Sequence, residues 1–150
     1  MSLNDRQQLN KVYLVTAILF AVMVYVFVAA YTGEKAKNVY TLDGGTFDIS
    51  VTVIVTEDTA YARKYINDNL HVDVNTEDFD SRGTTFPSVE GYPTIVWLPR
   101  ADNISIINHE LLHATIDIMR RVGIPLDDNT EEAYTYELQY LSNQFDKIRK

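Results

Sequence analysis

The chain has no cysteine and only three histidines among its 150 residues. The lack of cysteine excludes disulfide bonds, thiolate metal sites and cysteine nucleophiles. Any metal ion must therefore be held by histidine and carboxylate ligands. Hydrophobic residues make up 46% and charged residues 23%, which is typical of a globular protein and excludes a low-complexity chain.

Basic residues are scarce relative to acidic ones. Thirteen lysines and arginines stand against 21 aspartates and glutamates, which gives a net charge of -8. All of the acids except Asp5 and all of the bases except Arg6 and Lys11 follow Tyr31. A surface of this charge repels phosphate backbones, so we expect no nucleic-acid partner.

One long stretch, residues 12–31, lacks charged side chains altogether and reads VYLVTAILFAVMVYVFVAAY. At about 1.5 Å of rise per residue, a helix of this length matches a hydrocarbon core of about 30 Å. Tyr13 and Tyr31 lie at its ends, where aromatic rings favour the membrane interface. The sequence therefore predicts a single-pass membrane protein, with a tail at 1–11, a transmembrane anchor at 12–31 and the membrane as a partner.

Two other interpretations of this stretch stay open. It could be a buried core helix, although a small domain can hardly enclose a helix that is apolar all round. It could also be a cleaved signal peptide, with Val28 and Ala30 as the small residues before the cut, although its apolar run exceeds the usual length of about 7 to 15 residues. Lysine and arginine are balanced at the two ends, so the side of the membrane that holds the domain is undetermined.

Residues 32–45 are polar and contain the pair Gly44 and Gly45, so we expect a linker there and a folded domain over 46–150. Alternating apolar residues over 47–55 predict a strand, and TIVWL at 94–98, between two prolines, predicts another at or near a sheet edge. Helical spacing predicts helices over 58–69, from 102 or 105 to 122, and from 129 or 130 onward. Residues 71–93 are expected to be mostly loop, with one short strand near 72–74 as a candidate. The predicted fold class is α+β.

Residues 109–113 read HELLH, an H-E-x-x-H pattern inside the predicted helix. Positions i and i+4 of a helix share one face, so His109 and His113 suit one zinc ion. Glu110 is rotated by about 100° and lies beside the metal, where it can act as general base on a bound water. Coincidence is the alternative, but the pattern uses two of the three histidines, and these two histidines lie off the apolar stripe of the helix.

A hydrolytic zinc needs a third protein ligand, and no histidine follows His113. Glu131 and Glu132 at the start of the next helix are the candidates. Glu132 also fits a helix capping box with Asn129, and both interpretations stay open. Asp117, one turn beyond His113, is a candidate to orient an imidazole, and a solvent-exposed helix aspartate is the alternative.

Several residues are candidates for the stabilisation of an oxyanion or the placement of a substrate. Tyr134, Tyr136 and Tyr140 could donate a phenolic hydrogen bond, and His71 could do so if its loop folds over the cleft. For each of these four, packing or simple solvation is the alternative. The strand at 94–98 is a candidate to pair with an extended substrate.

With HExxH on one helix and a glutamate on the next, the sequence resembles the gluzincin branch of the zincin metallopeptidases. It is also similar to small phage-type zincin-like proteins through FDISVTVIVTED, FDSRGTTF, YPTIVWLP, HELLHATIDIM and EEAYTYELQYL, over about residues 46–145. The resemblance implies a zincin-like domain in which His109, His113 and Glu132 hold Zn²⁺ and Glu110 is the base. One departure is Tyr136, where the gluzincin pattern has an acidic residue.

Together these observations predict a membrane-anchored zinc metallopeptidase with a polypeptide substrate. The expected fold is a transmembrane helix followed by a small zincin-like domain, in which a short sheet packs on the HExxH helix and a C-terminal helix. The alternative is a membrane-anchored binding or structural protein that keeps this fold without turnover.

Overall fold

The computed structural model describes residues 16, 20, 23, 38–79, 82–89 and 91–150. The chain divides into two compact units, Met1–Glu34 and Lys35–Lys150. In the first unit, the described residues Thr16, Phe20 and Met23 are helical and exposed. The second unit contains the sheet, its covering helices and the HELLH segment.

The second unit contains a four-stranded mixed sheet in the order β1-β2-β4-β3. The strands are β1 (Asn38–Asp43), β2 (Ser50–Val55), β3 (Thr84–Phe86) and β4 (Thr94–Leu98). The two inner strands, β2 and β4, run parallel, and each outer strand is antiparallel to its neighbour. A 3-10 turn, η1 (Gly45–Phe47), connects β1 to β2, and a second one, η2 (Thr76–Phe79), precedes β3.

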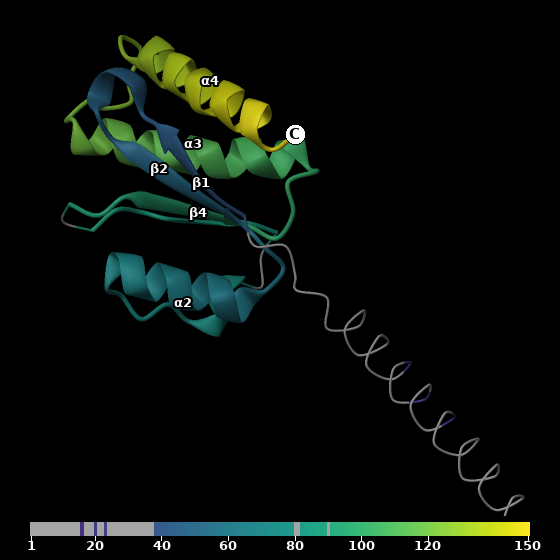
Figure 1. Ribbon diagram of the computed structural model, residues 1–150. Coiled ribbons are helices and arrows are strands. Elements are labelled where there is room, and N and C mark those ends of the chain that lie inside the picture. Colours follow the sequence, from purple (N-terminus) through teal and green to yellow (C-terminus); the bar gives the residue numbers. More distant parts are fainter. Residues whose placement is uncertain (1–15, 17–19, 21–22, 24–37, 80–81, 90) are drawn as a thin grey trace, which may run out of the picture. The chain divides into compact units, whose positions relative to one another are not determined.

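Three described α-helices cover this sheet: α2 (Thr59–Leu70), α3 (Ile104–Arg121) and α4 (Glu131–Ile148). Helix α2 lies on one face, and α3 and α4 lie side by side on the other (Figure 1). Each face has its own hydrophobic core. Leu42, Val53 and Val96 pack with residues of α3 and α4, whereas Ile54, Ile95 and Trp97 pack with residues of α2.

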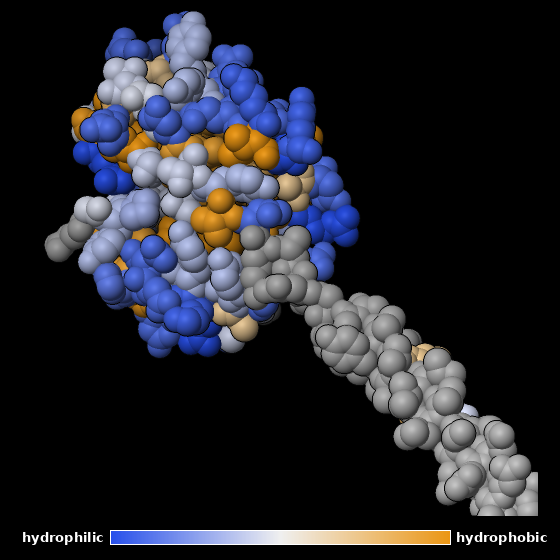
Figure 2. All heavy atoms as spheres, viewed as in Figure 1, coloured by the Kyte–Doolittle hydropathy of each residue, from blue (hydrophilic) through white to orange (hydrophobic). Residues whose placement is uncertain are grey.

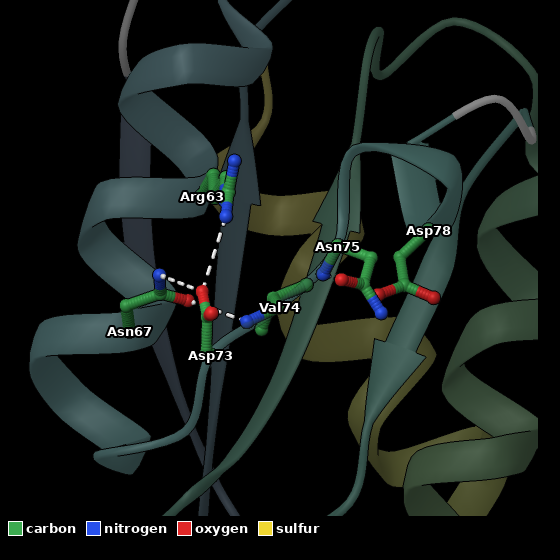
Figure 3. A network of polar contacts seen from close by, with 6 residues as sticks. All are labelled: Arg63, Asn67, Asp73, Val74, Asn75 and Asp78. Carbon is green, nitrogen blue, oxygen red and sulfur yellow. Dashed lines mark hydrogen bonds and ion pairs between the residues drawn. The ribbon is translucent and has the colours of Figure 1, made fainter.

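Polar contacts fasten the segment that follows α2. Asp73 accepts hydrogen bonds from Arg63 and Asn67, and the backbone N–H of Val74 donates to Asn67 at 3.0 Å (Figure 3). These contacts tie the chain between α2 and η2 to the helix. Figure 2 shows that hydrophilic side chains cover most of the visible face of this unit, with hydrophobic ones gathered in small areas.

The predicted transmembrane helix requires a correction. Of the range 12–31, all but Thr16, Phe20 and Met23 lie outside the described residues. In the part of the chain that the structure describes, no helix is both long and apolar enough to cross a membrane. The two 18-residue helices, α3 and α4, each carry at least four charged side chains. This finding contradicts the predicted fold with a transmembrane helix and the predicted single-pass membrane localisation. The described residues of the second unit form a four-stranded mixed sheet with three helices.

The predicted linker over 32–45 overlaps a strand. Residues Asn38–Asp43 form β1, which pairs in antiparallel register along the full length of β2. Its side chains are mostly exposed and only Leu42 is fully buried, because β1 is an edge strand. Its polar sequence therefore resembles a linker.

The strand at 94–98, predicted at or near a sheet edge, is the inner strand β4, which lies next to the edge strand β3. All five residues of β4 are buried, since helices cover both faces of the sheet. Pro93 and Pro99 lie just outside the strand and leave its ladder intact. The outer strand on this side is β3, which lies within the stretch that was expected to be loop, and no strand forms at 72–74.

Candidate functional site

His109, Glu110 and His113 all lie in helix α3. The helix begins after Asn103, whose side chain accepts hydrogen bonds from the backbone N–H groups of Ser105 and Ile106. Its buried stripe, which includes Ile107, Leu111, Ala114 and Ile118, packs on the sheet. Both histidines lie off this stripe and are exposed, so their rings are accessible to a ligand.

The two imidazoles are close enough to share one ion. The Nε2 atoms of His109 and His113 are 3.2 Å apart, and the rings meet edge to face. Two nitrogens at about 2.0 to 2.1 Å from a tetrahedral zinc are separated by about 3.3 Å. The same distance also suits an imidazole–imidazole hydrogen bond. The separation of the two Nε2 atoms is therefore compatible with a shared zinc ion but does not require one.

Glu110 is buried beside this pair and points toward β3. Its side chain is only 6% exposed, and the Thr85 hydroxyl lies 2.8 Å from its Oε2 and 2.9 Å from its backbone carbonyl oxygen. Thr85 thus positions the carboxylate from the outer strand of the sheet. Gly83 permits this close approach, because a Cβ there would lie 3.0 Å from the Glu110 Cγ.

A cavity of about 460 Å³ joins these residues. The β3 side contributes Gly83, Thr84, Thr85 and Pro87, and the α3 side contributes His109, Glu110 and His113 together with the next two turns of the helix. The histidine pair and the candidate base therefore open into one space that is bordered by the outer strand β3. We call it the histidine cavity.

The Thr85 hydroxyl should contribute to the stability of the fold and to the position of the Glu110 carboxylate. Thr85→Val removes the hydroxyl and leaves a buried carboxylate without its donor, which we expect to cost about 1 to 3 kcal/mol of unfolding free energy. Urea denaturation measures this loss. Thr85→Ser keeps the hydroxyl and should lose much less. A loss in Thr85→Ser with unchanged stability in Thr85→Val would attribute the effect to the methyl group, which valine keeps and serine lacks.

Asp117 lines the same cavity but is engaged elsewhere. It is only 6% exposed, and its Oδ2 accepts hydrogen bonds from the backbone N–H of Ser88 at 3.0 Å and from the hydroxyl of Thr94 at 2.6 Å. Neither expectation from the sequence describes it, since it is neither solvent-exposed nor hydrogen-bonded to an imidazole. It ties α3 to β4 and to the segment after β3.

The structure does not bring Glu132 to the histidines. Glu132 is exposed and lines a different cavity, of about 580 Å³, with Asn108 and Tyr136. Asn108 is hydrogen-bonded to Ser142 of α4, so α4 contacts the flank of α3 opposite to the one that carries Glu110. Among the described residues, no group of three histidine, cysteine, aspartate or glutamate side chains could hold a metal ion. Glu131 is likewise exposed, in the first turn of α4, whose N-cap is Thr130 rather than Asn129.

Glu132→Gln should therefore leave zinc affinity within about twofold of the unmodified chain, because its side chain lines a separate cavity. Competition with a chromophoric zinc chelator measures this. A loss of zinc affinity of tenfold or more would restore Glu132 as a ligand and would mean that α4 moves when metal binds.

The aromatic and histidine candidates also lie away from the histidine cavity. Tyr134 is buried and its hydroxyl donates to the carbonyl oxygen of Ile124 at 2.8 Å. Tyr136 and Tyr140 are exposed on α4 and line a cavity beside η1. His71 is the left-handed C-cap of α2, with its ring against Tyr92. None of the four lines the histidine cavity.

Among the described residues, the titratable side chain with the most strongly raised pKa is Glu137 on α4. Burial, and secondarily the negative charge of Asp43, raises its pKa from 4.5 to about 7. The side chain is only 7% exposed, and its Oε1 has no hydrogen-bond partner in the described part of the chain. A carboxylate in this position is costly to ionise.

This side chain predicts a pH-dependent stability. Between pH 4.5 and about 7 the folded chain keeps a proton on Glu137 that the unfolded chain releases, so stability falls as the pH rises through this window. The loss should reach roughly 3 kcal/mol above pH 7. Urea unfolding at pH 5 and pH 8 measures it, with Glu137→Gln removing most of the difference. An unchanged difference in that variant would assign the dependence to other groups.

No family model, no curated protein and no solved structure matches the chain.

Proposed function

We propose that the chain is a zinc-dependent peptide hydrolase in which His109 and His113 bind the metal and Glu110 is the general base. The observation that carries this proposal is the 3.2 Å separation of the two Nε2 atoms next to a buried carboxylate in one cavity. The histidine pair suits a metal, and the carboxylate lines the same cavity as the pair, which a general base requires. The resemblance to the gluzincins supports the same assignment.

In the proposed hydrolysis, each of these residues would have a separate role. His109 and His113 would hold a zinc ion, which would supply Lewis-acid chemistry for the hydrolysis of a peptide bond. Glu110 accepts the proton of the attacking water and returns it to the leaving amine. Thr85, through its hydrogen bond to Oε2, holds the Glu110 carboxylate against β3. Glu132 is not part of the proposed ligand set, because it lines another cavity.

An extended polypeptide is the substrate that best suits the position of β3. This strand is an outermost strand of the sheet and contributes to the wall of the histidine cavity. A substrate strand added beside it would continue the sheet and bring its backbone carbonyls along the cavity. The proposed substrate platform is thus β3 in place of the strand at 94–98, which lies inside the sheet.

The experiment that tests this proposal is hydrolysis of a mixed peptide library by the zinc-loaded chain, with products identified by mass spectrometry. We expect cleavage that stops when EDTA is added and returns with zinc. Cleavage that persists in EDTA would contradict a metal-dependent hydrolase.

A zinc-binding protein without turnover is the second candidate. The same histidine pair supports it, since two imidazoles whose Nε2 atoms are 3.2 Å apart suit a metal ion whether or not a substrate is hydrolysed. It predicts stoichiometric zinc binding without cleavage of any library peptide. Zinc content and turnover measured on one sample therefore separate the two candidates.

A further inference from the structure

A second cavity lies between α4 and the turn that joins β1 to β2. It has a volume of about 800 Å³, and its walls include Asp43, Phe47, Tyr136, Glu137 and Tyr140. None of the residues that line it lines the histidine cavity. We call it the α4 cleft.

The walls of the α4 cleft are held in place by specific contacts. Gln144 of α4 clamps the end of β1, since its side chain accepts from the backbone N–H of Asp43 and donates to the Asp43 carbonyl oxygen. Gly45 has a φ of 57°, and a Cβ on it would lie 3.1 Å from the ring of Tyr140. The turn and the helix therefore meet closely enough to form a defined cleft.

Glu137 gives this cleft an unbalanced negative charge. More than nine-tenths of its side chain is buried, and no described group donates a hydrogen bond to its Oε1. Asp43 adds a second carboxylate, and no lysine or arginine lines this cavity among the described residues. A buried carboxylate without a donor is stabilised by a proton or by a cation brought from outside. The raised pKa of Glu137 agrees with this deficit of positive charge.

The aromatic rings of the cleft indicate what kind of cation fits. Tyr136 and Tyr140 are 66% and 43% exposed, which is high for rings of this size, and Phe47 lies in the same cavity. Aromatic faces attract ammonium and guanidinium groups and cover their aliphatic stems. Calcium prefers six to eight oxygen ligands, so rings suit it poorly. The combination of carboxylates and rings therefore favours an organic cation.

We propose that the α4 cleft binds a lysine or arginine side chain of another polypeptide, with the cationic group between Glu137 and Asp43 and the aliphatic stem against the tyrosine rings. The net charge of -8 on the chain favours approach of such a basic partner. The site is separate from the histidine cavity, and its occupation does not depend on zinc or on hydrolysis.

The test is an NMR titration of the ¹⁵N-labelled full chain with acetyl-Ala-Lys-Ala-amide at pH 8, where Glu137 is mostly ionised. The matched control ligand replaces lysine by norleucine, which keeps the stem and removes the charge. We expect shifts confined to residues 43–47 and 133–143 with the lysine peptide, and at least tenfold weaker binding of the norleucine peptide. Equal binding of the two peptides, or shifts elsewhere, would overturn the proposal.

Variants locate the binding energy. Glu137→Gln should weaken the lysine peptide at least tenfold, whereas Glu77→Gln, which removes the same charge from the exposed turn η2, should leave its affinity unchanged. If Glu137→Gln does not fold, Tyr140→Leu tests the site in its place, and we expect it to weaken binding of the lysine peptide at least threefold. Unchanged affinity in the folded cleft variant would contradict the site.

Two further ligands identify the source of the cation. Cadaverine has the same ammonium chemistry without a polypeptide, and we expect weaker binding than for the lysine peptide. Tighter binding of cadaverine would replace the polypeptide by a free amine. Calcium chloride should cause no shift in the α4 cleft, and a calcium footprint there that displaces the peptide would make it an inorganic cation site.

Discussion

Glu110→Gln should lower peptide hydrolysis by about 10² to 10⁴-fold while zinc stays bound. Glutamine keeps the size and polarity of the side chain and can still pair with the Thr85 hydroxyl, whose oxygen lies 2.8 Å from Oε2. It cannot accept the proton of an attacking water. Steady-state turnover and zinc content, measured on the same preparation, give the two halves of this prediction.

The control for Glu110→Gln is Thr85→Ser, which keeps the hydroxyl that positions the carboxylate and should retain most of the turnover. If Glu110→Gln hydrolyses peptides as fast as the unmodified chain, Glu110 is not the base. If the Glu110→Gln variant loses zinc together with activity, the Glu110 carboxylate is a metal ligand and not the general base.

His113→Ala should reduce zinc affinity by at least about 100-fold and abolish metal-dependent hydrolysis. Mutation of a residue that only hydrogen-bonds to a metal ligand typically lowers metal affinity by 10- to 100-fold. Loss of the ligand itself should therefore lower it more. The same loss is expected for His109→Ala, since the two Nε2 atoms form one donor pair. Isothermal titration with zinc measures both.

His71→Ala is the matched control, because His71 caps α2 and lies outside the histidine cavity. It should bind zinc as the unmodified chain does. Full zinc occupancy in the His109→Ala/His113→Ala double variant would show that the metal site lies elsewhere.

The helices, and the position of the HELLH motif within one of them, could be predicted from the spacing of apolar and capping residues along the sequence. The HELLH segment lies inside α3 as expected, because its apolar stripe and the cluster of capping residues at 102–105 act within a few turns. The N-cap itself is Asn103, since three neighbouring side chains can all cap and only the packed helix selects one. In β2, alternation predicted one buried face, but Thr52 and Ile54 are buried as well because α2 covers the second face.

The residues around the motif could not be predicted, since long-range packing determines them. Thr85 and Gly83 lie at a three-residue strand that is too short for a periodic signal. Glu132 was assigned from its place in the sequence and from the resemblance, but that assignment required α4 to reach the metal side of α3. Instead α4 packs over β1 and on the other flank of α3.

Zinc titration of the metal-free full chain, with hydrolysis of one cleaved peptide measured at each step, tests the central claim most directly. The proposal predicts that turnover rises from zero and saturates at about one zinc per chain, and that the His109→Ala/His113→Ala double variant stays inactive at every step. Turnover by the metal-free chain, or equal turnover by the double variant, would contradict a hydrolase built on the two histidines of α3.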